Sequence, residues 1–575
     1  PKTGQSLDEV RDLLLEEVAK LREGDFDEKL IEATINNYKM QLMRSFEEND
    51  SRAILYVYSF ISGADWADEV ARLDRMSKIT KQDVVEWANK YLGPESYAII
   101  YKREGKDPDE QKIAAPKITP IVTNRDSQSE FLSEIQTSQV QPIEPVFVDY
   151  KKDMSQFEAQ PGIDVLYKKN ETNDIFTLIY VFNTGTENDP ALNLAFNYLS
   201  YLGTDKMTAE EIASEMYDIA CSFYMNAGAN QSSIQITGLS ENMGKAMEIV
   251  EGLIAGAKPD EAILENCKAD MLKSRADAKL NQSRCFGALQ RYLFYGGDFI
   301  RRTTLTDPAL QALTSEQLLA KIGGLMGKQH EVLYYGPQKE AEVKSALAEH
   351  HKVAADLQPL EKKFSTLLPT DANKVVLAQY DAKQLYYLQF SNRGEKFDVA
   401  ADPEITLYNE YFGGGMNTIV FQEMREARGL AYTAWATLAT PSNANGDYSY
   451  YAFIATQNDK MQKAVEAFDD IINNMPESEK AFGIAKEALV SRLRTERTVK
   501  DGVLWSYLRA RDLGLDAPRD KQIFEKVQSM TLDDVKAAQQ KWVKGRKYVY
   551  GILGDIQDLD LNYLKTLGPI QTVSQ

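Results

Sequence analysis

The sequence predicts an α+β protein made of repeated domains, in which helices pack on one face of a mostly antiparallel sheet. The first observation is a tail pattern that occurs three times, beginning at Thr80, Thr314 and Thr531. Each threonine is followed three residues later by an acidic or amide residue, which is typical of a capping box opening an amphipathic helix. Each helix is followed by a short β-branched and aromatic run, which predicts a strand.

The second observation is a pair of helices that precedes each tail. The predicted tail strands are Ser96–Tyr101, His330–Tyr335 and Lys547–Ile552. Roughly 60 residues before each tail lies an amphipathic helix, containing Leu15–Leu21, Ala246–Ile254 or Ala464–Ile472. A second long helix follows each of these, over Leu30–Ser45, Ala262–Ala276 and Glu479–Glu496. Agreement in order and spacing across three copies indicates an internal repeat.

The front parts of the copies differ in length. The second copy opens with predicted strands near Ile163–Tyr167 and Ile175–Asn183, then a helix near Pro190–Tyr201. The third copy does likewise, from Lys374 to a strand near Tyr448–Ile454. The first copy has only the residues up to about Arg11 in that place, so we expect it to lack roughly 75–80 residues and the chain to start inside a domain.

These comparisons divide the chain into five segments. We expect the C-terminal part of a second domain, an interdomain linker, a third domain, a short linker and a fourth domain, over 1–104, 105–149, 150–351, 352–372 and 373–575. The long linker is rich in Lys, Asp, Gln, Ser, Thr and Pro, and it has little amphipathic order. A helix is expected before the short linker, over Lys339–His351.

Charge and composition exclude several classes of protein. With 575 residues the chain is too long for one core. No apolar run approaches the roughly 18 residues of a membrane span, so no span is expected. No signal sequence is visible at Pro1. The formal charge of −20, from 86 acidic and 66 basic residues, argues against nucleic acid as a partner. Cys221, Cys267 and Cys285 are too dispersed for a metal site and are expected to be unpaired, buried thiols.

The most distinctive stretch runs from Gly413 to Tyr432. A run of three glycines opens it, an amphipathic helix is expected to follow, and Gly429 marks the expected end of that helix. The residues from Leu430 to Thr440 are β-prone and predict a strand. A helix that ends at Gly429 would leave Arg425 and Tyr432 near one cleft. The alternative interpretation is an ordinary helix end with solvated arginines and a core tyrosine.

This stretch resembles a signature of the pitrilysin/insulinase family of zinc peptidases. The pattern F-x-x-L-R-x-x-x-x-L-x-Y from the C-terminal half of that family is matched at Phe421, Met424, Arg425, Leu430 and Tyr432. The resemblance covers nearly the whole chain and implies repeated domains of the pitrilysin/mitochondrial-processing-peptidase-like metallohydrolase type. It also implies two halves joined by a long linker, and an intact polypeptide with roughly 300 further residues upstream.

The resemblance implies that the zinc site lies in a region absent from this sequence. The family binds zinc with an inverted H-x-x-E-H helix motif, in which two histidines hold the metal and the glutamate activates water. The corresponding positions of the second copy are Leu194, Asn197 and Tyr198, none of which suits zinc. Such a departure is typical of the third domain of the family. Zinc is therefore expected as the cofactor of the intact protein, and no zinc is expected on this chain.

The three histidines, His330, His350 and His351, do not rebuild a zinc motif, because none are four residues apart. Adjacent residues of a helix point about 100° apart and do not easily share one tetrahedral metal site. We therefore interpret Glu349–His351 as the polar end of a linker helix, and His330 as a structural residue.

The resemblance also implies roles for the residues of the signature. Tyr432 is expected to donate a hydrogen bond to the oxygen that becomes negative during peptide hydrolysis, and Arg425 to bind substrate carbonyls or to position Tyr432. Gly413, Gly414 and Gly415 would let the backbone approach the peptide, or they would only form a tight turn. Arg428 is expected to be solvated.

The resulting hypothesis is the substrate-binding C-terminal half of a zinc-dependent endopeptidase or oligopeptidase. Peptides enclosed between two halves are the expected substrates, and the N-terminal half of the same protein the expected partner; this chain alone is expected to be inactive. One alternative is a non-catalytic partner subunit of the same fold that pairs with a zinc-bearing chain. The other is a catalytically dead assembly module, which would not require the Arg425–Tyr432 pair.

Overall fold

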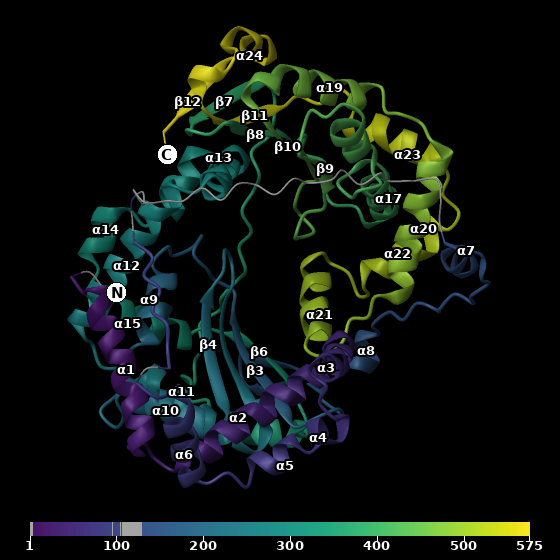
Figure 1. The fold of residues 1–575 in the computed structure, drawn as a ribbon. Helices are drawn as coiled ribbons and strands as arrows, with labels where there is room; N and C mark the ends of the chain where they lie inside the picture. Colours follow the sequence, from purple (N-terminus) through teal and green to yellow (C-terminus); the bar gives the residue numbers. More distant parts are fainter. Residues whose placement is uncertain (1–3, 95, 104, 106–128, 575) are drawn as a thin grey trace. The chain divides into compact units, whose positions relative to one another are not determined.

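The computed structural model describes residues 4–94, 96–103, 105 and 129–574 (Figure 1). The chain divides into two compact units. The first contains Pro1–Lys39 and Asn49–Glu144, and the second contains Met40–Glu48 and Pro145–Gln575.

Among its described residues, the first unit contains helices and no strand. Its helices are α1 (Leu7–Glu23), α2 (Lys29–Phe46, which continues into the second unit), α3 (Asn49–Ser62), α4 (Trp66–Val70), α5 (Arg72–Met76), α6 (Lys81–Tyr91) and α7 (Glu130–Thr137). The capping box predicted at Thr80 is confirmed, since Thr80 and Asp83 bond reciprocally at the start of α6.

One prediction for this unit is wrong. Ser96–Tyr101 is not a strand. A strand needs a neighbour to take up its backbone hydrogen bonds, and no strand is found among the described residues of this unit. The predicted linker contains helix α7, whose N-terminus is capped by Ser129. The rest of that linker, over 106–128, lies outside the described residues.

The second unit contains two six-stranded sheets. Five strands of one sheet have the same order as five strands of the other. The first has the order β1-β2-β6-β3-β5-β4 and the second β12-β7-β11-β8-β10-β9. The strands of the first sheet are β1 (Ser155–Gln160), β2 (Ile163–Lys169), β3 (Ile175–Phe182), β4 (Cys221–Ala227), β5 (Ser232–Leu239) and β6 (His330–Gly336). Those of the second are β7 (Lys374–Gln379), β8 (Gln384–Ser391), β9 (Thr433–Ala439), β10 (Ser449–Gln457), β11 (Val549–Gly554) and β12 (Ile570–Val573).

Strand pairing is mostly antiparallel in both sheets, as predicted. In the first sheet only β2 and β6 are parallel, with Ile163 beside His330. In the second sheet β11 and β12 both lie parallel to β7. The sheets differ at one edge, where β1 precedes the first core and β12 follows the second. The two predicted tail strands therefore lie inside their sheets, where both neighbours come from the front part of the same copy.

Helices cover one face of each sheet. The part of the chain that contains the first sheet also contains the helices α8 (Tyr150–Asp153), α9 (Leu192–Leu199), α10 (Ala209–Asp218), α11 (Met243–Gly256), α12 (Glu261–Lys279), α13 (Gln282–Thr303), α14 (Asp307–Ala312), α15 (Ser315–Met326) and α16 (Glu340–His350). Those of the second sheet are α17 (Asp402–Phe412), α18 (Ile419–Phe421), α19 (Met461–Asn473), α20 (Glu479–Thr495), α21 (Gly502–Asp512), α22 (Arg519–Val527), α23 (Leu532–Ala538) and α24 (Leu561–Leu567). Short helical turns complete the set at Ser240–Asn242, Val399–Ala401, Gln422–Ala427, Asn458–Lys460, Gln539–Val543 and Ile556–Asp558.

The opposite face of each sheet is covered by a helix from the other repeat. Apolar side chains of α13, including Leu289 and Leu293, pack on Val376 and Leu388 of the second sheet. In return, Leu504 of α21 packs in one cluster with the outward-facing residues of the first sheet. Figure 1 shows α13 beside β8 and β11, and α21 contacts β2 of the first sheet. The sequence predicted helices on one face of each sheet, and this exchange completes that arrangement.

Two further expectations concern the whole of the described chain. Cys221, Cys267 and Cys285 are free and buried, as predicted. Among the described residues, no helix is long and apolar enough to cross a membrane.

Candidate functional site

The glycine run forms a tight connection between α17 and α18 and packs against strand β9. A side chain at Gly413 would place its Cβ 2.3 Å from the backbone oxygen of Asn409, and one at Gly414 would lie 2.8 Å from the Cβ of Trp435. Both glycines therefore have a steric reason to be there. A Cβ at Gly415 would meet only ordinary contacts, so that glycine is not required by packing.

The segment after the glycines is more widely coiled than the sequence predicted. A regular amphipathic helix was expected, but α18 continues as a π-helical turn over Gln422–Ala427. The turn is closed by bonds from the amide of Arg428 to the oxygen of Glu423, and from the amide of Leu430 to the oxygen of Met424. Gly429 has the left-handed conformation (φ +58°) and ends the helical path, as predicted.

This ending brings Arg425 and Tyr432 together, as the spacing predicted. The guanidinium carbon of Arg425 lies 4.9 Å from the ring centre of Tyr432 and 5.0 Å from that of Phe421. A cation stacked between two aromatic rings is held in place without losing its charge. Tyr432 is 71% exposed, so its ring is not a core residue.

The polar ends of this pair are open to solvent. Within the part of the chain that the structure describes, no hydrogen-bond partner is found for the Tyr432 hydroxyl. The nearest carboxylate to Arg425 is that of Glu426, 3.7 Å from its Nε. The pair can therefore offer a phenol and a guanidinium to a ligand at the surface. Arg428, expected to be solvated, instead lies 3.3 Å from both Glu423 and Asp470.

The edge of β9 beside the site is partly closed to another strand. The side chain of Asn409 donates to the oxygen of Leu438 and accepts from its amide, each at 2.9 Å. The amide of Ala436 donates to the oxygen of Gly413. A peptide cannot extend the sheet along these residues, because their outward backbone groups are already paired. Recognition at this end of the sheet is left to side chains.

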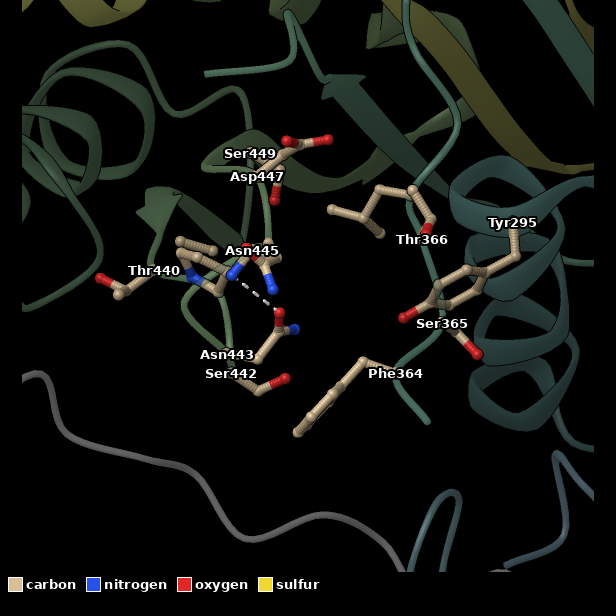
Figure 2. A pocket seen from close by; sticks show the side chains of 14 residues that line it. Tyr295, Phe364, Ser365, Thr366, Thr440, Ser442, Asn443, Asn445, Asp447 and Ser449 are labelled. Atoms are coloured by element: carbon tan, nitrogen blue, oxygen red, sulfur yellow. Dashed lines mark hydrogen bonds between the residues drawn. The ribbon is translucent and has the colours of Figure 1, made fainter. Parts of the chain in front are cut away.

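Two cavities lie near the glycine run. The smaller, about 240 Å³, is bordered by Gly415 and Thr440, with Glu410 and Arg492 3.8 Å apart on its wall. The larger, about 470 Å³, also borders Thr440. Figure 2 shows Tyr295, Phe364 and Ser365 on one side of the larger cavity and Asn443 and Asn445 on the other.

The larger cavity is polar, but its main polar groups are bonded within the fold. Asp447 pairs with Lys396 at 2.7 Å and accepts from Asn392, and Ser365 donates to Glu187. The amide of Asn445 donates to the side chain of Asn443, the bond drawn in Figure 2. No sequence pattern predicts this cavity, because its walls come from three distant parts of the chain.

The structure offers no set of side chains that would suit a zinc ion. Within the described residues, no group of three or more His, Cys, Asp and Glu side chains could hold a metal. At the positions that correspond to the zinc motif, Leu194 and Tyr198 face the core while Asn197 is exposed. The Tyr198 hydroxyl donates to Ser315 at 2.8 Å, so this helix carries a structural bond in that place.

Comparison with known proteins assigns part of the chain to a family. Residues 329–489 match the model described as the peptidase M16 inactive domain. This range runs from the start of β6 into α20 and contains the glycine run, Arg425 and Tyr432.

Two curated relatives carry the name zinc protease. An uncharacterized zinc protease from Rickettsia bellii is 23% identical over 312 residues, which are 52% of this chain and 70% of the relative. Another from Streptomyces coelicolor is 22% identical over 266 residues, 43% of this chain and 56% of the relative.

Solved structures share the fold at low sequence identity. A peptidase M16 inactive domain from Pseudomonas fluorescens is 18% identical with a TM-score of 0.56, covering 70% of this chain and 98% of that one. The periplasmic protease PqqL from Escherichia coli is 13% identical with a TM-score of 0.56, covering 95% of this chain and 63% of that one. The chain thus spans only part of the length of some of its relatives.

Together these findings confirm the predicted resemblance and the predicted fold class. Residues 329–489 match the peptidase M16 inactive domain, and the chain has the α+β fold of the solved structures it resembles. Its relatives include proteins named zinc proteases, which supports a peptidase-like class.

Proposed function

We propose that this chain is the substrate-binding part of a zinc-dependent endopeptidase or oligopeptidase. The observation that carries the proposal is the exposed, stacked pair of Arg425 and Tyr432 beside the glycine run. A catalytically dead assembly module would not require a phenol and a guanidinium held together at the surface. The zinc proteases among the relatives support the reaction class.

The proposed role follows from the charge that peptide hydrolysis creates. The carbonyl oxygen of the scissile bond becomes negative in the tetrahedral intermediate, and donors already aimed at it lower the barrier. Tyr432 would donate its hydroxyl proton in a hydrogen bond to that oxygen. Arg425 stacks on the same ring, so it would fix the direction of the phenol and add a positive charge nearby.

Gly415 is the glycine with room for a substrate. Gly413 and Gly414 are explained by close packing, whereas Gly415 borders the smaller cavity and a Cβ there would meet only Thr418, at 3.6 Å. We therefore propose Gly415 as the point where a peptide comes closest to this backbone, with Gly413 and Gly414 forming the turn that presents it.

The zinc ion would be held elsewhere. The donors of the described residues do not suit zinc, so no step of hydrolysis is assigned to a metal on this chain. The ion would come from another region of the same polypeptide or from a partner chain. The described part of this chain would contribute binding and charge stabilisation only.

Substitution of the pair in the natural polypeptide tests this role. We expect Arg425→Ala and Tyr432→Phe each to lower kcat/KM for a quenched peptide by about 10²- to 10³-fold, because each removes a donor from the developing charge. Arg428→Ala and Tyr224→Phe are matched controls. Arg428 is engaged with Glu423 and Asp470, and Tyr224 is an exposed tyrosine, 65% accessible, on another sheet.

Unchanged turnover in both variants would exclude the proposed role. Activity that appears only when a separate zinc-bearing chain is added would instead assign the pair to a partner subunit acting in trans.

A further inference from the structure

A second cluster of ionisable side chains lies far from the glycine run, inside the first sheet's domain. His330 begins β6, His351 follows the last residue of α16, and Glu251 lies on α11. The two histidines are 4% and 1% exposed. The Nε2 atoms of His330 and His351 lie 2.8 Å apart, which is hydrogen-bonding distance.

The other nitrogen of each ring is also bonded. Nδ1 of His330 lies 2.8 Å from the backbone oxygen of Lys328, and Nδ1 of His351 lies 2.5 Å from Oε1 of Glu251. A carbonyl oxygen can only accept, so Nδ1 of His330 must carry a proton. One proton must lie between the two Nε2 atoms, and another between His351 and Glu251.

Counting protons gives an unexpected total. Three hydrogen bonds need three protons, whereas two neutral imidazoles beside an ionised carboxylate hold only two. Without the third proton, two nitrogen lone pairs would face each other at 2.8 Å. With it, the positive charge on the rings balances Glu251, so the buried group is neutral overall. Imidazole is a stronger base than a carboxylate, so the extra proton belongs on the rings.

The surroundings keep water away from this proton. The ring of Tyr180 on β3 lies 4.2 Å from that of His351, and Phe182 lies 4.6 Å from His330, measured between ring centres. Burial raises the pKa of Tyr180 well above its ordinary value, and the charge of Glu251 raises it further, so this phenol stays neutral.

The other ionisable groups near the cluster lie at its edge. On α16, the side chain of His350 is 20% exposed and lies 4.0 Å from Glu349, so this histidine faces solvent and does not join the pair. From the segment before β6, Lys328 contributes its backbone oxygen. Glu331, next to His330, is paired with Arg511 of α21.

A bound metal ion is a poorer explanation than a proton. Convergent Nε2 atoms whose Nδ1–H groups are held by oxygens also occur around metals. Here, no group of three or more suitable side chains exists among the described residues. The pair offers a metal two nitrogens only.

We propose that His330, His351 and Glu251 form a buried site for one proton, which fastens the end of α16 to β6 and α11. Lys352, the residue after His351, begins the connection to the second sheet. The shared proton therefore attaches the start of that connection to the first sheet. The prediction that His351 belongs to the polar end of a helix is wrong, because its ring is buried and bonded at both nitrogens.

Nitrogen-15 NMR of histidine-labelled protein tests the site directly, because the chain contains only three histidines. From the hydrogen bonds we expect His351 to carry protons on both ring nitrogens, and His330 to be neutral with its proton on Nδ1. Two neutral rings in place of this pattern, or a stoichiometric metal ion bound between Nε2 atoms that lack protons, would overturn the proposal.

Unfolding by urea gives a second, independent measurement. His351→Gln and Glu251→Gln each remove a bond from the buried group and leave its partner unsatisfied. We expect each to raise the unfolding constant by about 10- to 100-fold, whereas the control His350→Gln should change it little. Unfolding constants of His351→Gln and Glu251→Gln equal to that of the unaltered chain would contradict the site, and the NMR result stands even where a variant does not fold.

Discussion

At the scale of single residues, the stacked pair of Arg425 and Tyr432 shows how a short motif becomes a surface for a ligand. Gly429 in the left-handed conformation ends the helical path, and Tyr432 then enters the strand next to its own arginine. The tyrosine is exposed because the ring lies on the guanidinium and not in the core. This part of the site could be predicted from sequence, since a glycine and a spacing of seven residues determine it.

The steric role of the glycines gives the first stability prediction. A methyl group at Gly413 would meet the backbone of Asn409, which cannot move without disturbing the end of α17. We expect Gly413→Ala to lower the free energy of unfolding by about 1–3 kcal/mol. The control Gly415→Ala should change it little. Urea unfolding of the three proteins measures both values, and equal stability would show that the turn has other ways to relax.

His330 gives a prediction for acid. Burial, together with the charge of His351, lowers the pKa of its imidazole to about 4. In the unfolded chain the ordinary pKa is about 6.5. Between these values His330 binds a proton in the unfolded state but not in the folded state. The free energy of unfolding therefore falls as the pH drops from about 6.5 to about 4. The expected loss is about 3 kcal/mol.

The variant His330→Gln isolates this contribution. Its urea-unfolding midpoint should decrease less steeply than that of the unaltered chain between pH 6.5 and pH 4.5. Parallel profiles would show that His330 does not resist protonation in the folded protein.

The burial of His351 illustrates what sequence could not show at this scale. The residue ends a polar-looking run, but its partners lie 21 and 100 residues away in the chain. No local pattern connects those positions. The polar residues at this helix end therefore led to the wrong prediction that the ring of His351 lies in a polar environment.

At the scale of helices and strands, the exchange of α13 and α21 holds the two sheets of the second unit together. Each helix leaves its own repeat and covers the otherwise exposed face of the other sheet. A sheet with apolar residues on both faces needs such a cover. The sequence predicted helices on one face of each sheet, and it did not indicate which helix would cover the other face.

Truncation of one side chain in this contact tests its weight. Leu289 of α13 is 4% exposed and packs against the second sheet. We expect Leu289→Ala to cost about 2–5 kcal/mol, whereas Arg284→Ala on an exposed position of the same helix should cost little. Urea unfolding compares the two variants. A loss of the same size in both would mean that this contact does not determine the effect.

The tail strands show when a repeat pattern is sufficient. Two of the three predicted tail strands are confirmed as β6 and β11, and each lies between strands from the front of its own copy. The third, over Ser96–Tyr101, is wrong because the described part of the first unit contains no strand to pair with it. Sequence patterns indicate the preference for a strand, and pairing decides whether the strand forms.

At the scale of the whole molecule, we propose that residues 150–351 and 373–575 are two copies of one domain. Five strands of each sheet have the same order. The sheets differ only in the edge strand, which comes before these five strands in the first copy and after them in the second. The division of the rest of the chain into a partial domain over 1–104 and a linker over 105–149 stays a prediction. The acidic charge of the chain remains without an assigned role.

The most direct test of the proposed function compares this chain with the natural polypeptide that contains it. The two proteins would be measured for zinc content and for cleavage of a quenched peptide, with and without a chelator. We expect this chain alone to bind no stoichiometric zinc and to cleave no peptide. We expect the natural polypeptide to bind zinc and to cleave the peptide, and to lose this activity with the chelator and with Tyr432→Phe. Chelator-sensitive cleavage that is unaffected by Tyr432→Phe and Arg425→Ala would contradict the proposed function.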